Sequence, residues 1–315
     1  MSNDQKTAEE IFLSIDFERI IDHPNILISA AFWEPERYRA ARVCYKILRQ
    51  IDDMVDDHKA AHGGVSETDR QQLTAGVERW LALCMDHGLD DQACMELSET
   101  IEKFRIPLWP LEDFARSMIY DINNEGFKTL EDFITYSNGA SVAPAGIFVH
   151  LCGLRRNGME YLLPEFDVRD AATPCALFSY IVHIIRDFRK DQLNNLNYFA
   201  GDMMEKRGLT TADLRRMAEG EPLSDGFRSM IADYMEVADS YRIRTLEVIR
   251  EISPKLGIRH RLSLEIIFNL YLMVFERIDQ ANGSFTAEEL VPAPADTWQR
   301  VREVIDRFFS REHKY

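Results

Sequence analysis

Long stretches without glycine or proline run through most of this 315-residue sequence. Its 15 glycines and 11 prolines make up about 8% of the chain, whereas average usage is about 12%. Residues 36–59 contain neither, and they follow Pro35, which suits the first turn of a helix. The same pattern predicts helices over residues 66–83, 129–151, 169–191 (with Pro174 as a start or a kink), 226–252, 259–280 and 296–309. Because the linkers are short and polar, we expect an all-α fold and a single domain over residues 1–315.

The charge and the cysteines exclude several classes of protein. With 37 Lys and Arg against 53 Asp and Glu, the formal charge is −16, which argues against a nucleic-acid partner. The five cysteines show no CxxC spacing, so we expect free thiols rather than a zinc ribbon or a disulfide framework. Residues 1–6 lack the apolar segment of a secretory signal, and no apolar stretch is long enough to span a bilayer. We therefore expect a cytoplasmic protein.

The first candidate functional motif is acidic and lies within residues 36–59. Asp52 and Asp56 are four residues apart, so on a helix their carboxylates share one face. Asp53 and Asp57 form a second pair, about 100° around the helix. Like charges at this spacing destabilise an isolated helix, whereas Mg²⁺ favours carboxylate oxygens. The motif therefore predicts either a metal site or a solvated acidic face.

The same spacing occurs again 135 residues after the first motif. His183, Asp187 and Asp191 form a polar stripe in a segment that is otherwise rich in Ile, Val, Phe and Tyr. Burying carboxylates without cations costs several kcal/mol each. We therefore expect the two aspartate pairs to face each other across the core of a helical bundle and to hold Mg²⁺.

Two arginines accompany the aspartates. Arg49 lies one turn before Asp52, and Arg186 directly precedes Asp187. Carboxylates bind Mg²⁺ and guanidinium groups donate to free phosphate oxygens, so this combination suits a Mg²⁺–diphosphate group.

Together these motifs resemble those of the squalene/phytoene synthases, over about residues 23–283. The first motif reads Tyr-x3-Arg-x2-Asp-Asp-x2-Asp, and the second aspartate motif follows it in the family's order. A further segment, which includes Tyr136, resembles the one that lines the prenyl cavity of the family. The matching stretches are residues 32–57, 118–121, 136–146, 184–191, 196–200 and 208–210.

The resemblance implies an isoprenoid-synthase fold, a helical bundle around a central cavity. It also implies a Mg²⁺-dependent prenyltransferase that condenses two allylic prenyl diphosphates, farnesyl or geranylgeranyl diphosphate, head to head and releases diphosphate. The reaction would pass through a cyclopropylcarbinyl diphosphate, and an apolar product would favour peripheral contact with a membrane. The implied residues are Tyr45, Arg49, Tyr136 and Tyr271 for catalysis, Arg49, Tyr180, His183 and Arg186 for substrate binding, and Asp52, Asp53, Asp56, Asp187 and Asp191 for the metal.

The second motif departs from the family pattern at two positions. Tyr180 and His183 stand where Gln and Asn are usual. A neutral imidazole is a poorer Mg²⁺ ligand than an amide oxygen, so we expect either that one metal is held differently or that His183 hydrogen-bonds the diphosphate instead.

Polar groups usual in the family are also absent elsewhere. His23 is followed by Pro24 rather than by serines, and residues 284–289 lack the usual basic cluster. Either Mg²⁺ would then carry more of the neutralisation of the diphosphates, or another arginine would help, for which Arg259 and Arg261 are the nearest candidates.

Two other functions stay open at this point. One is a terpene cyclase that acts on a single prenyl diphosphate, and the other is a catalytically silent relative that serves as a binding or assembly protein. The two aspartate pairs argue against the silent protein, whereas the missing basic cluster argues for it. Because there is no GxGxxG or Walker A motif, the sequence does not support NADPH as a cofactor. The sequence predicts no oligomeric state.

Overall fold

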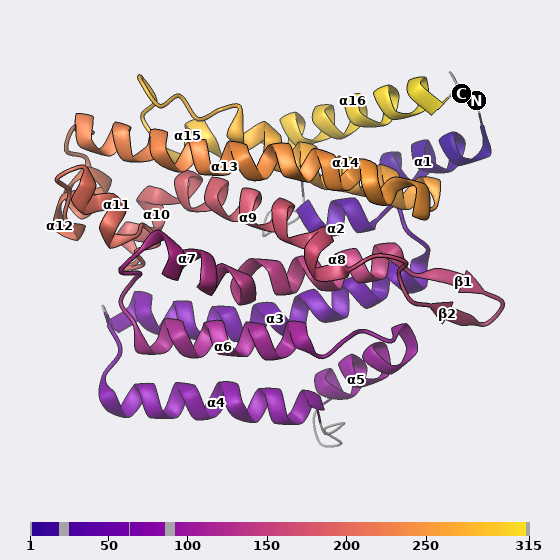
Figure 1. Ribbon diagram of the computed structural model, residues 1–315, viewed down its shortest axis with the longest axis horizontal. Coiled ribbons are helices and arrows are strands. Elements are labelled where there is room, and N and C mark those ends of the chain that lie inside the picture. The colour runs from indigo at the N-terminus through magenta and orange to yellow at the C-terminus, as the bar shows by residue number, and fades with distance from the viewer. Residues whose placement is uncertain (1, 19–24, 63, 86–91, 313–315) are drawn as a thin grey trace.

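Helices form almost all of the regular structure in the computed structural model, which describes residues 2–18, 25–62, 64–85 and 92–312 (Figure 1). The all-α prediction is therefore confirmed, and the described residues add only one small hairpin, of β1 (Arg155–Asn157) and β2 (Glu160–Leu162). In chain order the α-helices are α1 (Asn3–Ser14), α2 (Asn25–Ala30), α3 (Pro35–His62), α4 (Glu67–Met85), α5 (Gln92–Phe104), α6 (Trp109–Asn123), α7 (Leu130–Ser137), α8 (Ala143–Gly153), α9 (Val168–Arg186), α10 (Phe188–Leu193), α11 (Gly201–Lys206), α12 (Thr211–Glu219), α13 (Asp225–Ile252), α14 (Ile258–Phe275), α15 (Ala287–Leu290) and α16 (Pro294–Glu312).

Local sequence signals explain where several helices begin. Pro35 is the first residue of α3, where its missing N–H leaves no helical hydrogen bond unmade. The Ser66 hydroxyl accepts from the backbone N–H of Asp69, at 3.2 Å, and so caps α4 as predicted. Thr129 and Asp132 form a capping box that starts α7.

The predicted helix over residues 129–151 is interrupted in the structure. After α7, residues Asn138–Val142 form a π-helical turn, and α8 follows. Gly139 lies in this turn, where a Cβ atom would come within 2.1 Å of the Asp113 carbonyl of α6. The close approach of the two backbones therefore requires glycine at this position.

The predicted helix over residues 169–191 continues through its proline but ends earlier. The side chain of Asp167 caps α9, and the helix passes Pro174 without ending. The backbone then leaves the helical conformation at Asp187, with φ −92° and ψ 6°, before α10 begins. The second aspartate pair therefore spans a helix break rather than one continuous helix.

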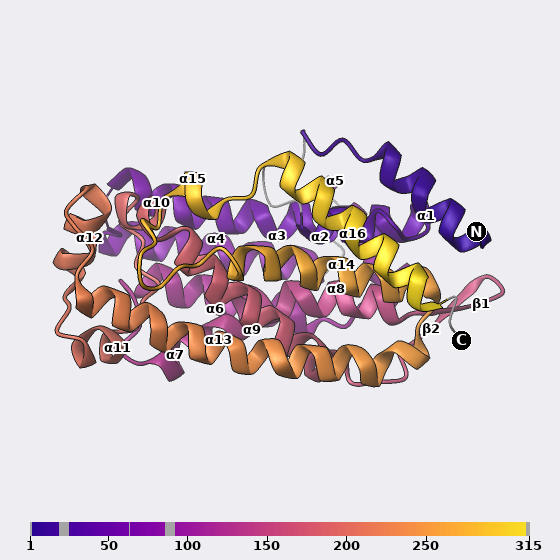
Figure 2. The same ribbon diagram turned by 90° about the horizontal axis from the view of Figure 1, so that it is seen from above.

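Helix α9 lies at the centre of the bundle and contacts α7, α8, α10, α13 and α14. Helices α4 and α5 form an outer layer against α3 and α6, while α1 and α16 cover α14 (Figure 1). The short helices α10, α11 and α12 lie at one end of the molecule, and the β-hairpin projects at the opposite end (Figure 2). In the described part of the chain, no helix is apolar over a stretch long enough to cross a bilayer.

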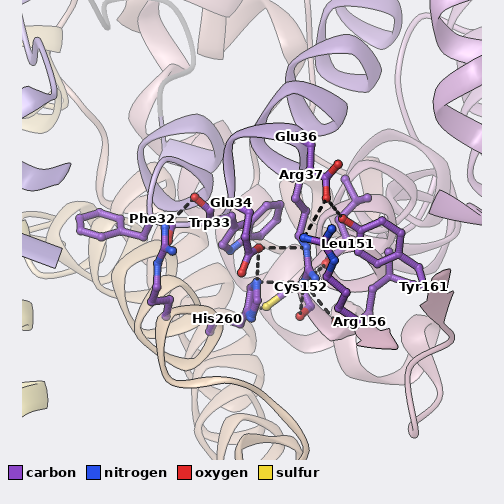
Figure 3. A network of polar contacts seen from close by, with 12 residues as sticks. Phe32, Trp33, Glu34, Glu36, Arg37, Leu151, Cys152, Arg156, Tyr161 and His260 are labelled. Carbon is purple, nitrogen blue, oxygen red and sulfur yellow. Dashed lines mark hydrogen bonds and ion pairs between the residues drawn. The ribbon is translucent and has the colours of Figure 1, made fainter. Parts of the chain in front are cut away.

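A buried polar network joins the start of α3 to the end of α8 and the start of α14 (Figure 3). The side chain of Arg37 is only 3% exposed, and its Nη1 donates to the Leu151 and Leu154 carbonyls at 2.9 and 3.2 Å. The same nitrogen lies 2.8 Å from Nε2 of His260. Glu34 completes the network, with its Oε2 3.4 Å from both Arg37 Nε and His260 Nε2. Contact with His260, aided by the Arg37 charge, lowers the pKa of Glu34 from 4.5 to about 2.

This network predicts an acid-sensitive contribution to stability. We expect Glu34→Gln to lower the free energy of unfolding by about 1–2 kcal/mol at pH 7, because Arg37 keeps its buried charge but loses its counter-ion. A carboxylate whose pKa is lowered on folding stabilises the fold above its unfolded pKa, so the difference should fade as the pH drops from about 4.5 towards 2. Urea denaturation of both proteins at several pH values measures it.

Glu205→Gln, at an exposed position on α11, is the matched control and should leave stability unchanged at every pH. A Glu34→Gln effect that is the same at pH 7 and pH 3 would contradict the proposed ion pair.

Candidate active site

One large cavity of about 960 Å³ runs between α3, α8, α9, α13 and α14. Such a volume lies at the upper end of the range for small-molecule sites. Most of its length is apolar, with lining residues such as Ile147, Phe148, Val248, Ile252 and Leu264. Charged side chains line it as well, and those from the two predicted motifs belong to the middle of α3, the end of α9 and α10.

The first motif lies on the cavity side of α3. Asp52 and Asp56 both line the cavity, as their spacing on one helical face predicts. Arg49 also lines it, and its Nη1 lies 2.8 Å from Asp52 and its Nη2 2.5 Å from Asp53. Asp53 itself is not among the lining residues, and its side chain is 45% exposed. The structure thus separates Asp53, a predicted metal ligand, from the other aspartates.

The second motif approaches the same cavity from the junction of α9 and α10. Arg186 donates to both oxygens of Asp187, each at 2.7 Å, while His183 Nε2 lies 3.5 Å from that carboxylate. Burial alone would raise the pKa of Asp187, but these partners lower it to about 2. Asp191 lies one turn later, on α10, and lines the cavity together with Asp187, His183 and Arg186. The helix break therefore keeps all four side chains of this motif at the cavity.

The remaining carboxylates are close enough to disturb one another. Burial and the charge of Asp187 raise the pKa of Asp191 to about 8. Burial also raises the pKa of Asp56, and the charges of Asp52, Asp121 and Asp191 add to this effect. These aspartates come from α3, α6 and α10, so the acidic end draws on three separate helices. A cation at this end would relieve the repulsion between them.

The donor chemistry of the acidic end fits Mg²⁺, which prefers carboxylate oxygens. Within the described residues, however, no three His, Cys, Asp or Glu side chains are arranged to hold an ion by themselves. Mg²⁺ is commonly bound through one or two carboxylates together with waters and substrate phosphates. Part of the Mg²⁺ coordination would then come from the carboxylates of Asp52, Asp56, Asp187 and Asp191. A diphosphate would supply the rest.

Four tyrosines line the cavity: Tyr45, Tyr180, Tyr198 and Tyr271. Burial raises the pKa of Tyr180 and Tyr198 well above 10 and that of Tyr271 to about 12, so these phenols stay neutral. Tyr136, which the resemblance implies is catalytic, does not line the cavity. Its ring centroid lies 6.3 Å from that of Tyr180, and it is 4% exposed. Its position therefore favours packing against Tyr180 rather than direct contact with a ligand.

The expectation that Arg259 or Arg261 faces the diphosphate is wrong. Arg259 donates to the Phe32 and Trp33 carbonyls, at 2.6 and 2.7 Å, and therefore fastens α14 to the α2–α3 turn. Arg261 places its guanidinium 5.6 Å from the centre of the Phe308 ring of α16. Neither arginine lines the cavity, because both belong to the first turn of α14. The residues of α14 that line the cavity lie in its later turns.

Two other cations take part in the lining, and the sequence analysis missed both. Arg189 and Lys190 follow Asp187 on α10. Arg189 donates to the Met217 and Ser284 carbonyls, at 3.0 and 3.1 Å, which fixes its position. Lys190 is exposed and has no ion pair with any described residue, so its ammonium group is available to a ligand. Its place between the two aspartates of the motif was the signal that could have revealed it.

Asp121 is a further residue that sequence reasoning did not single out. It is 8% exposed on α6 and accepts from Lys59 Nζ of α3 at 2.6 Å. Its charge acts on Asp52 and Asp56. His23 and Pro24, by contrast, lie outside the described residues.

The raised pKa of Asp191 predicts how the stability of the metal-free protein depends on pH. A carboxyl group whose pKa is raised on folding stabilises the fold below its unfolded pKa, and that contribution is lost as the pH rises towards about 8. In EDTA we therefore expect Asp191→Asn to gain stability relative to the unmodified protein as the pH rises from about 4 to 8. Thermal unfolding across this range measures the gain.

The matched control is Asp57→Asn on α3, which replaces an exposed aspartate outside the cavity lining. Its difference from the unmodified protein should not change with pH. If Asp191→Asn behaved like this control, the carboxyl group would not be held in the buried, acidic surroundings described above.

Comparison with known proteins agrees with this geometry. A phytoene synthase of Narcissus pseudonarcissus is 26% identical over 180 residues, which cover 57% of this chain and 40% of the relative. A second, from Solanum lycopersicum, is 22% identical over 183 residues, 57% of this chain and 55% of the relative. The chain thus spans about half or less of the length of these curated relatives.

Solved structures show the same fold over nearly the whole chain. A dehydrosqualene synthase in complex with ligand matches with a TM-score of 0.68 at 15% identity, covering 99% of this chain and 100% of its own. Squalene synthase HpnC from Alicyclobacillus acidocaldarius matches with a TM-score of 0.59 at 16% identity, covering 87% of this chain and 94% of its own.

The family model described as squalene/phytoene synthase matches residues 24–300. Members of this family are prenyltransferases. The match covers well over half of the chain, and the chain belongs to the squalene/phytoene synthase family.

Proposed function

We propose that this protein is a Mg²⁺-dependent prenyltransferase that condenses two allylic prenyl diphosphates head to head. The observation that carries the proposal is one cavity with a long apolar part and with Asp52, Asp56, Asp187 and Asp191 in its lining. A prenyl diphosphate also has an apolar part and a charged part. Its hydrocarbon chain is apolar, and its head group carries several negative charges. Binding would place the chain along the apolar helices and the head group at the carboxylates.

Ionisation of the first substrate would occur at the acidic end. The C–O bond breaks, its electron pair leaves with the diphosphate, and an allylic cation forms. Mg²⁺, when bound, neutralises charge on the departing diphosphate and so favours this bond cleavage. Arg49 and Lys190 line the same part of the cavity and would donate to diphosphate oxygens that carry the new charge.

The carbon–carbon bond would form among the neutral tyrosines. The faces of Tyr45, Tyr180, Tyr198 and Tyr271 can stabilise a cation that has left its counter-ion. The apolar lining excludes the water that would otherwise capture the cation. The double bond of the second substrate supplies the electron pair for the new bond, and loss of a proton closes the three-membered ring of the cyclopropylcarbinyl diphosphate.

Product analysis tests the proposed reaction. Purified protein with Mg²⁺ and either farnesyl or geranylgeranyl diphosphate should yield a head-to-head product that mass spectrometry detects. One diphosphate is released for each pair of substrates if the reaction stops at the cyclopropylcarbinyl diphosphate, and two are released if that intermediate ionises again to give a hydrocarbon. Asp56→Asn should lower kcat by about 100-fold or more, because it removes a charge needed to hold the metal at the departing group. Parallel incubations with and without NADPH reveal any reductive second step.

Asp57→Asn should retain full activity, because this residue is exposed on the same helix and lies outside the cavity lining. Products derived from one substrate alone would indicate a terpene cyclase instead. No turnover, together with no rise in melting temperature on adding Mg²⁺ and diphosphate, would indicate a catalytically silent protein.

Lys190 supplies a second prediction about the same reaction. We expect Lys190→Gln to raise KM for the prenyl diphosphate about tenfold, which corresponds to about 1.4 kcal/mol, since the cavity loses an exposed cation that forms no ion pair with the described residues. The effect should shrink as the salt concentration rises, because an exposed charge is screened. Steady-state kinetics at low and high salt measure both effects.

Lys128→Gln removes an exposed lysine of the α6–α7 connection and should leave KM unchanged. An unchanged KM for Lys190→Gln at low salt would exclude Lys190 from head-group binding.

A further inference from the structure

A second, smaller cavity of about 270 Å³ lies beside the acidic end of the main cavity. Residues from α3, α4, α6, α10 and α12 surround it, together with the segments 64–65, 124–126 and 195–198. Tyr198 lines both cavities, so its side chain forms part of the wall between them. The volume lies just below the usual range for sites of drug-sized ligands, which suits a small ion better than a nucleotide or a prenyl chain.

Three cationic side chains from three different helices line this second cavity: Lys59 of α3, Arg70 of α4 and Arg215 of α12. Their convergence is notable in a chain with a formal charge of −16. The other polar lining consists mainly of carboxamides, from Asn124, Gln192, Asn195 and Asn197, which can donate as well as accept.

Two of the three cations already have partners in the structure. Lys59 donates to Asp121 at 2.6 Å and to the Asn124 carbonyl at 3.4 Å. Arg215 donates to the Gln192 carbonyl at 2.5 Å and pairs with Glu219 at 2.6 Å. These contacts hold both side chains in place.

Arg70 differs from both of them. Its Nε is buried and has no hydrogen-bond partner among the described residues, and its side chain makes no ion pair with them. Because Nε itself is closed to solvent, an ion in the cavity would be bound by the Nη groups of the same side chain. Of the two acidic residues in the lining, Asp121 is taken up by Lys59, and Glu125 is exposed. The positive charge of Arg70 is therefore not balanced inside the cavity.

From this arrangement we infer that the second cavity is a binding site for a phosphate-type oxyanion. The guanidinium group of Arg70 would donate to two oxygens of the ion at once, a geometry that suits phosphate. The Asn124, Gln192 and Asn197 side-chain nitrogens already donate to other groups, so among these carboxamides Asn195 would donate to a further oxygen. Free orthophosphate and the inorganic diphosphate released by a neighbouring reaction share this chemistry, so either can occupy the site.

Isothermal titration calorimetry in EDTA, without Mg²⁺, tests the inference with orthophosphate and with diphosphate in separate arms. We expect one bound ion per chain, and we expect Arg70→Gln to weaken its affinity at least tenfold. Arg70→Lys should retain part of the affinity, because it keeps the charge but not the planar pair of donors. The arm with the tighter binding identifies the natural ion.

The matched control is Arg79→Gln, which removes an exposed arginine of the same helix outside both cavities and should bind the ion as the unmodified protein does. Arg49→Gln alters only the main cavity and should also retain EDTA-resistant binding. Loss of that binding in Arg49→Gln, unchanged binding in Arg70→Gln, or no binding in either arm would overturn the inference. Each of these results leaves the proposed prenyltransferase reaction untouched, because that reaction is measured separately with Mg²⁺ and prenyl substrates.

Discussion

Loss of hydration on folding is the largest effect on the carboxylates at the acidic end of the main cavity, and repulsion between neighbouring carboxylates adds to it. Asp52 and Asp56 on α3 and Asp191 on α10 lose hydration, and each also feels the charge of another aspartate. In a protein without a ligand this arrangement costs stability, since each group would be better hydrated at the surface. In the proposed reaction, a bound cation and its anionic partner would recover this free energy. The arrangement would then be a case of stability given up for binding, which is common at active sites.

The surrounding helices hold these carboxylates at the cavity by apolar packing. The second motif lies where α9 ends, and Phe188, directly after Asp187, is fully buried against Phe227 and Phe199. Because this side chain anchors the start of α10, the helix break has a fixed geometry. The two hydrogen bonds from Arg186 then orient Asp187. Asp191 follows on α10 with its own backbone N–H bonded to the Asp187 carbonyl at 2.9 Å.

The sequence predicts much of this arrangement, because helical spacing and capping are local properties. The start of α4 at Ser66, the length of α3 and the shared face of Asp52 and Asp56 all follow from residues within a few positions of each other. Nearby residues do not predict the helix break at Asp187 or the π-helical turn around Gly139, because contacts with distant helices decide both. The same is true of single side chains. Arg259 lies near Tyr271 in the sequence, but its direction depends on the Phe32 and Trp33 carbonyls, more than 220 residues away.

Tertiary contacts also decide how far the apolar part of the cavity extends. Phe148 lines the cavity, and its ring packs at 4.7 Å against that of Trp33, which in turn lies 6.1 Å from the His260 ring. Trp33 directly precedes Glu34, so this ring lies beside the ionic network of Glu34, Arg37 and His260 (Figure 3). A buried ionic network contributes little net stability, but its hydrogen bonds accept few alternative geometries. An apolar wall beside such a network cannot shift freely to admit a longer chain. In the proposed reaction, the length of hydrocarbon that the cavity accepts would therefore be set at the end remote from the aspartates, by residues that take no part in the chemistry.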